Sequence, residues 1–190
     1  MSSIPNFKIK AKGVISEEFL KMDIITFEKA TEFIQCMDYG RNSNKDNLSL
    51  LFIENKGTCS TKHALLKQLT TENGILDIQL ILGIFRMNGI NTPEVANTLL
   101  KNNLQYIPEA HTYLKLKEER FDFTRKNSSP NDFQNDLILE FEIQPNEINT
   151  RKIDIHKNFI KKWQQSINSK LTSEEIWNIR EQCIKDLETN

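Results

Sequence analysis

The sequence lacks any long uninterrupted apolar run. Its most apolar stretch, Ile75 to Phe85, is interrupted by Asp77 and Gln79. It is also shorter than the roughly 20 residues that a membrane-spanning helix needs. The segment Met1 to Lys10 lacks the apolar run of a signal peptide. We therefore expect a protein without membrane-spanning segments, located in the cytoplasm.

The sequence also lacks paired cysteines and a large excess of either positive or negative charge. The cysteines Cys36, Cys59 and Cys183 lack the spacing of a zinc site, a redox motif or a disulfide framework. The chain carries 25 basic and 26 acidic residues, so its overall field favours neither nucleic acid nor anionic lipid as a partner. We expect a reducing compartment, no metal, no cofactor, no nucleic-acid partner and no membrane.

Internal repeats, low-complexity tracts and clear domain boundaries are also absent from the sequence. The 190 residues suit one domain, and their 38 % hydrophobic content is enough for a sizeable core. We predict a single α+β domain over residues 1–190, with its core at about 40–145 and a helical C-terminal extension at about 150–190.

Apolar periodicity predicts the order of the secondary-structure elements. Helices are expected at 27–37, 59–72, 93–101, about 156–167 and 173–187, with a helical turn at 17–22. Strands are expected at 75–87, 109–116, 120–124 and 137–143, with a short strand or extended arm at 8–15. The segments 39–44 and 127–135 resemble loops, and the apolar run 48–53 is too short to distinguish helix from strand.

A glycine, a threonine and a cysteine begin the helix expected at 59–72. Thr58 is a good N-cap, because its side-chain oxygen can accept a hydrogen bond from a first-turn amide. Cys59 then lies where the positive end of the helix dipole favours a thiolate over a thiol. The same position also suits a small buried hydrophobic residue, and this segment alone does not separate the two interpretations.

Two alternating segments, 109–116 and 120–124, predict a hairpin around the polar residues Lys117 to Glu119. With an even loop, one face carries the apolar residues Leu114, Leu116, Phe121 and Phe123. The other face then carries His111, Tyr113, Asp122 and Thr124. The apolar pattern therefore predicts that His111 and Asp122 share a surface, in facing or diagonal positions.

Cys59, His111 and Asp122 together suit nucleophilic catalysis. A thiol needs a base to take its proton, and histidine titrates in the right range. The histidine needs a carboxylate on its other nitrogen to fix its tautomer and orientation. The first-turn amides of the cysteine helix point toward negative charge and are suited to stabilising a tetrahedral intermediate.

The order cysteine, histidine, aspartate along the chain resembles that of the transglutaminase-like superfamily of cysteine acyl-transfer enzymes, a branch of the papain-like group. Three blocks carry the resemblance: Gly57 to Cys59 with the helix Lys62 to Leu69, Gly74 through the strand to Gly83, and His111 to Leu114 with Phe121 to Thr124. The sequence also differs from the family pattern. Ser60 follows the cysteine where many members have an aromatic residue, and Phe123 follows the aspartate where a proline is common. The segment 91–108 is also longer than is usual in the family.

The resemblance implies a transglutaminase-like core, with the nucleophile helix packed on an antiparallel sheet and further helices at both ends of the chain. It implies a cysteine hydrolase or acyltransferase that attacks an amide, peptide or ester carbonyl and forms a thioacyl intermediate. Its substrate would be a peptide, a protein or a small amide. The family also contains inactive members, so a catalytically silent protein that binds a peptide or protein partner in the same groove is the alternative.

Further candidate binding residues surround the cysteine in the sequence: Tyr39, Arg41, Asn42 and Asn44 in the upstream loop, with His63 and Tyr113. In papain-like enzymes an oxyanion donor often comes from upstream, although a solvated loop explains any single one of these residues. His63 lies one turn after Cys59 and could be proposed as the base, but we expect it to line the site or to pack. A metal site of Cys59, His63 and His111 matches no recurrent zinc pattern.

The C-terminal helices support a third interpretation, an interaction module, on their amphipathic pattern alone. The aromatic residues Trp163 and Trp177 lie in these helices and are expected in the core or at an interface. The sequence leaves open the acyl donor and acceptor, and the oligomeric state.

Overall fold

The structure is a computed structural model that describes residues 4–188. Its α-helices are α1 (Val14–Lys21), α2 (Phe27–Cys36), α3 (Leu50–Glu54), α4 (Cys59–Glu72), α5 (Ala96–Lys101), α6 (Thr150–Ser166) and α7 (Ser173–Glu188). Its strands are β1 (Asp38–Tyr39), β2 (Lys56–Gly57), β3 (Ile78–Met87), β4 (Ile107–Leu116), β5 (Glu119–Phe121) and β6 (Leu137–Ile143). The 3-10 helices are η1 (Pro93–Val95), η2 (Pro130–Asp132), η3 (Gln134–Asp136) and η4 (Pro145–Glu147). Within residues 4–188, no helix is both long and apolar enough to cross a membrane.

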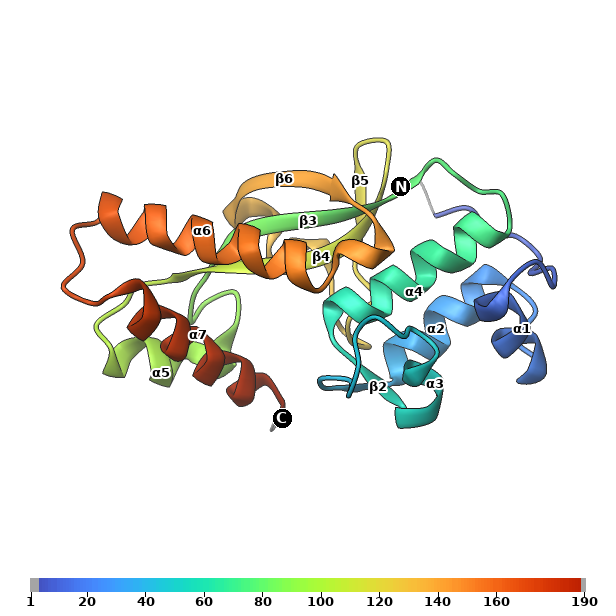
Figure 1. Ribbon diagram of the computed structural model, residues 1–190, viewed down its shortest axis with the longest axis horizontal. Coiled ribbons are helices and arrows are strands. Elements are labelled where there is room, and N and C mark those ends of the chain that lie inside the picture. The colour runs from blue at the N-terminus through green and yellow to red at the C-terminus, as the bar shows by residue number, and fades with distance from the viewer. Residues whose placement is uncertain (1–3, 189–190) are drawn as a thin grey trace. The chain divides into compact units, whose positions relative to one another are not determined.

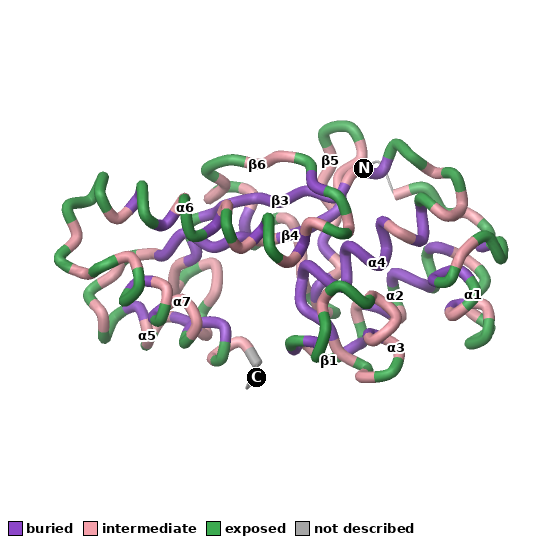
Figure 2. Tube along the Cα trace, in the orientation of Figure 1, coloured by how far each residue is buried: buried purple, intermediate pink, exposed green. Residues whose placement is uncertain are grey.

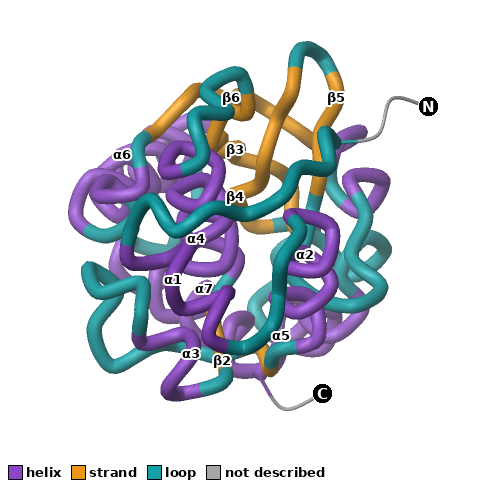
Figure 3. The backbone as a smooth tube through the Cα atoms, turned by 90° about the vertical axis from the view of Figure 1, so that its right-hand side faces the viewer, coloured by secondary structure: helices purple, strands orange, loops and turns teal. Residues whose placement is uncertain are grey.

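The fold is mixed, with helices and an antiparallel sheet, as the sequence predicted. The sheet has four strands in the order β5-β4-β3-β6. Figure 3 draws the strands in orange. The predicted hairpin is confirmed: Leu114 pairs with Phe121 and Leu116 with Glu119, which leaves a loop of two residues. Lys117, the first of them, has a φ of 54°, as the tight turns of two-residue hairpins require. The even loop length therefore puts the apolar residues of the two strands on one face.

The chain forms two compact units that interleave along the sequence. Unit 1 comprises residues 1–82, 112–130 and 141–149, and unit 2 comprises residues 83–111, 131–140 and 150–190. Strands β3, β4 and β6 contribute residues to both units. The single domain expected from the chain length stays a prediction.

In unit 1, α1 and α2 pack against the long helix α4 (Figure 1). Most of α4 is buried, which Figure 2 shows in purple, and Leu65, Leu66 and Leu69 supply its apolar core. Its C-terminal Glu72 accepts hydrogen bonds from the amides of Ile15 and Ser16 in the first turn of α1. The N-cap position of α1 is a glycine without a side chain, so this carboxylate from α4 caps the helix instead.

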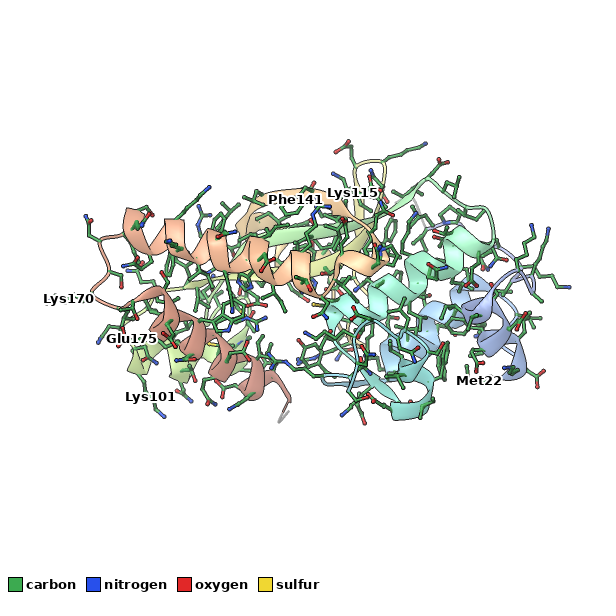
Figure 4. The ribbon with its side chains drawn as sticks, in the orientation of Figure 1. Met22, Lys101, Lys115, Phe141, Lys170 and Glu175 are labelled. Atoms are coloured by element: carbon green, nitrogen blue, oxygen red, sulfur yellow. The ribbon has the colours of Figure 1, made fainter. Side chains whose placement is uncertain are left out.

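In unit 2, α7 packs against both α6 and α5. The start of α7 is capped, because Glu175 accepts hydrogen bonds from the amide and the hydroxyl of Thr172. Figure 4 labels Lys101 at the end of α5, Lys170 in the connection between α6 and α7, and Glu175 in the first turn of α7. Arg180 of α7 forms a buried ion pair with Glu109 of β4, which ties the helix to the strand.

Some observed bounds differ from the predicted ones, for local reasons. The run at 48–53, which the sequence left open between helix and strand, overlaps a short helix, α3, and the predicted turn at 17–22 overlaps a longer helix, α1. Helix α6 begins at Thr150, earlier than predicted, because its first turns bury the polar residues Lys152 and His156 and so show no apolar periodicity. Strand β5 ends at Phe121, before the predicted residue 124, because the backbone then turns to bond a side chain.

Candidate active site

The N-terminus of α4 is built as the sequence predicted. Thr58 has extended backbone angles and its side chain accepts from the Thr61 amide, while the Thr58 amide donates to Thr61 Oγ1 at 3.0 Å. This reciprocal pair is a capping box, with threonine in place of the usual glutamate. A Cβ atom on Gly57 would lie 3.0 Å from side-chain atoms of Leu51, Lys62 and Thr61, so a larger residue beside the cap would have to displace these side chains.

Cys59 is the first residue of α4 and is 8 % exposed. Its sulfur lies 3.8 Å from the hydroxyl oxygen of Ser60, which lies 3.3 Å from the hydroxyl oxygen of Thr112 on β4. Thr112 directly follows His111 in the sequence. The first turn of the cysteine helix is thus bonded to the strand that carries the predicted base.

His63 is completely buried, and backbone groups hold both of its ring nitrogens. The Phe123 amide donates to Nε2 at 2.8 Å, which requires this nitrogen to carry no proton. Nδ1 therefore carries the proton and donates to the Cys59 carbonyl oxygen, 2.8 Å away. A neutral histidine held in one tautomer by these bonds is suited to packing and orientation, and this arrangement does not favour His63 as the base.

Asp122 is buried, and its carboxylate is held by the residue two positions later. Oδ1 accepts from the amide of Thr124 at 2.9 Å and from its hydroxyl at 2.5 Å. The same oxygen lies 3.6 Å from His63 Nε2. The side chain replaces a strand partner for the Thr124 amide, which explains why β5 ends before Asp122.

Lys62 lies next to His63 on α4 and was not among the candidates expected from the sequence. It is completely buried, and its ammonium donates to the carbonyl oxygens of Met37 at 2.6 Å and Thr124 at 2.8 Å. Burial, assisted by the nearby Arg125 charge, lowers the pKa of Lys62 to about 8. In the sequence, Lys62 lies beside the apolar positions of α4 and looks like an ordinary surface lysine, so no local pattern marks it as buried.

His111 belongs to unit 2, where it is partly exposed on β4 and packs beside two aromatic rings. Its ring centroid lies 4.8 Å from that of Phe133 and 6.2 Å from that of Phe85. Cys59 and Asp122 belong to unit 1, where His63 contacts the Cys59 carbonyl and lies near the Asp122 carboxylate. The relay of Cys59, His111 and Asp122 stays a prediction.

The upstream loop mainly supports the cap of α4. The Asn42 amide nitrogen donates to Glu54 and to the Lys56 carbonyl, and its oxygen accepts from Thr61 Oγ1 at 2.9 Å. Asn42 is therefore a structural residue as well as a candidate binding residue.

The other candidate binding residues have different surroundings. Asn44 accepts a hydrogen bond from the Asp46 amide in a turn, and the Tyr39 ring lies 4.6 Å from the Arg125 guanidinium. Arg41 is exposed, whereas Tyr113 is completely buried.

The other two cysteines differ in environment. Cys36 is exposed, whereas Cys183 is completely buried in unit 2. Burial, with the nearby Asp186 carboxylate, raises the pKa of Cys183 to about 12. Across residues 4–188, no group of three or more histidine, cysteine or carboxylate side chains is arranged to hold a metal ion.

Comparisons with protein-family models, with curated proteins and with solved structures each find no match to this chain.

Proposed function

We propose that the protein is a cysteine hydrolase or acyltransferase of transglutaminase-like type, acting on an amide, peptide or ester carbonyl. The proton of Cys59 passes to His111, and the sulfur attacks the carbonyl carbon. The tetrahedral intermediate breaks its bond to the leaving nitrogen or oxygen, which takes the proton from His111. Water or another acceptor, deprotonated by His111, then attacks the thioester and releases Cys59. Asp122 orients His111 throughout.

The capped start of α4 carries this proposal, because it puts Cys59 where the helix dipole favours a thiolate. The Ser60 hydroxyl lies 3.3 Å from the Thr112 hydroxyl, so the first turn of α4 is bonded to β4, the strand to which His111 belongs. Adjacent residues on a strand point to opposite faces, so this contact positions the strand and not the His111 ring. The first-turn amides of α4 also suit the oxyanion, because helix geometry points them out of the N-terminus.

The alternation of the sequence motivates the role of Asp122. The apolar pattern of residues 109–116 and 120–124 predicts that Asp122 and His111 share a face, and strand β5 itself ends one residue earlier, at Phe121. Burial and the two hydrogen bonds from Thr124 restrict the carboxylate to few orientations, as a group that orients a histidine requires.

A catalytically silent protein that binds a peptide is the second candidate. The observation that favours it is the 8 % exposure of Cys59, since a sulfur covered in this way presents little area to a substrate. In that case, the Thr58 cap and the Ser60 contact serve only the fold. Reactivity of the Cys59 thiol separates the two candidates.

The test is alkylation with iodoacetamide across pH 5 to 9, read at each cysteine by peptide mass spectrometry. Exposed Cys36 is the internal reference thiol. We expect Cys59 to react at a lower pH than Cys36, and His111→Ala and Asp122→Asn to remove this difference. His156→Gln, a change at a buried histidine of unit 2, is the control. Equal pH profiles at Cys59 and Cys36 in the wild type would reject the enzyme and leave the silent binder.

A panel of thioester-forming probes then addresses the substrate. Peptide amides, small amides and esters are incubated with the protein, and the mass of the Cys59 peptide is measured. An acyl adduct at Cys59 identifies the donor class, and its transfer to water or to an added amine identifies the acceptor. Adducts that also form on Asp122→Asn at an unchanged rate would count against the relay.

A further inference from the structure

Two consecutive residues of α4, Lys62 and His63, hold the segment that follows β5. Lys62 Nζ donates to the Thr124 carbonyl at 2.8 Å, and the Phe123 amide donates to His63 Nε2 at 2.8 Å. Both side chains are completely buried. The backbone at residues 123–124 is therefore fixed to the helix that begins with Cys59.

The second carbonyl that Lys62 binds lies at the end of α2. Lys62 Nζ donates to the Met37 carbonyl, 2.6 Å away, and Met37 is the C-cap of α2. Helix α2 has no basic residue in its own last turn, where the partial negative charge of a helix end favours a cation. Lys62 supplies that charge from α4. One ammonium thus joins α2, α4 and the segment after β5.

Thr124 connects this ammonium to the Asp122 carboxylate. Its carbonyl accepts from Lys62, while its amide and hydroxyl both donate to Asp122 Oδ1. A shift of the Thr124 backbone would therefore displace both donors from the carboxylate. The chain of contacts runs from the ammonium through a single residue to the group predicted to orient the base.

We propose that Lys62 is a positioning residue for the relay of Cys59, His111 and Asp122, acting through Thr124 on the Asp122 carboxylate. This inference rests on the proposed function, because the quantity it concerns is the reactivity of Cys59. Lys62 contacts no substrate in this role. Packing alone does not call for a charge here, since a buried ammonium is costly to desolvate and a methionine fills a similar volume.

Lys67 offers a matched control on the same helix. It is also buried, and its ammonium also donates to backbone carbonyls, at 2.6 Å to Ile78 and at 3.5 Å to Leu76. Those carbonyls lie at the start of β3 and just before it, away from the segment after β5 in the sequence. Lys67→Met therefore removes the same kind of interaction from the same helix without releasing Thr124.

The experiment compares Lys62→Met and Lys67→Met with the wild type by two measurements. Hydrogen exchange reads the amides of Phe123 and Thr124, and iodoacetamide alkylation reads the pH profile of Cys59. We expect Lys62→Met to speed exchange of both amides at least tenfold, to slow alkylation of Cys59 at pH 7 at least tenfold and to move its profile toward that of Cys36. We expect Lys67→Met to change neither measurement, although both variants alter thermal stability.

The possible results separate this inference from the proposed function. If exchange speeds up in Lys62→Met but the Cys59 profile stays at its wild-type position, the lysine is only structural and the positioning role is refuted. The role is also refuted if Lys67→Met shifts the profile equally, or if Lys62→Met leaves exchange unchanged. If wild-type Cys59 already behaves as an ordinary thiol, the proposed function itself fails and the positioning role falls with it. Circular dichroism verifies that both variants are folded.

Discussion

His63 Nδ1 lies 2.8 Å from the carbonyl oxygen of Cys59, one turn earlier in α4. This bond, with the Phe123 amide on the opposite nitrogen, leaves neither ring nitrogen available to take the thiol proton. The histidine nearest to the cysteine in the sequence is therefore occupied with structure. The more distant His111 keeps the role of base in the proposed mechanism.

Replacing His63 tests this structural role. We expect His63→Ala to lower the free energy of unfolding by about 1–3 kcal/mol, because the partly buried Phe123 amide loses its acceptor. His63→Gln should lose less, since its side-chain oxygen can accept that bond. Urea denaturation measures both variants. A loss in His63→Gln that equals the loss in His63→Ala would show that ring packing, and not the hydrogen bond, is what matters at this position.

The N-cap of α4 gives a second prediction. Thr58→Ala removes the acceptor for the Thr61 amide and should lower the free energy of unfolding by about 0.5–2 kcal/mol. Thr58→Ser keeps the hydroxyl and should lose less than Thr58→Ala. Urea denaturation of the two variants checks the order, and equal losses would mean that the methyl group stabilises the cap instead.

The third prediction concerns pH and His156 of unit 2. Burial lowers the pKa of His156 to about 4 from its ordinary 6.5, despite the nearby Glu109 carboxylate. Between these values the unfolded chain binds a proton that the folded protein does not, so stability falls as the pH falls from 6.5 to 4. The loss attributable to His156 is of the order of 3 kcal/mol.

His156→Gln isolates that contribution. The His156 ring donates to the Pro108 carbonyl at 2.8 Å, and a glutamine amide can donate in its place without titrating. Chemical denaturation at several pH values should show a shallower loss of stability in the variant between pH 6.5 and 4. The same slope in both proteins would contradict the assignment to His156.

The buried pair of Glu109 and Arg180 gives the fourth prediction. Burial alone would raise the pKa of Glu109, but the Arg180 charge, assisted by His156, lowers it to about 2. Arg180→Met leaves this carboxylate buried without its main partner, and we expect a loss of about 3–5 kcal/mol in the free energy of unfolding. Adding Glu109→Gln should recover part of the loss. If the double variant is less stable than Arg180→Met, the lone carboxylate is not the source of the cost.

The local sequence determined those structural features that depend on the preferences of a few neighbouring residues. Thr58 as the cap of α4 and the end of that helix at Asn73 and Gly74 follow from backbone preferences alone, and Gly74 has the positive φ of 78° that such an end favours. Strict alternation similarly determined the hairpin register, because a shift by one residue would turn Leu114 and Phe121 away from a common face. These features needed no knowledge of distant contacts.

Only the tertiary structure decided the roles of buried polar residues. A lysine within a helical pattern predicts a solvated face, and His63 was expected to line the site or to pack. Lys62, His63 and His156 are all buried, because backbone carbonyls and amides from other segments satisfy them. Those partners lie far away in the sequence, so no local pattern reports them. The sequence by itself therefore determined where a capped cysteine and a β-hairpin occur, and long-range hydrogen bonding decided that Lys62 and His63 hold the segment that follows β5.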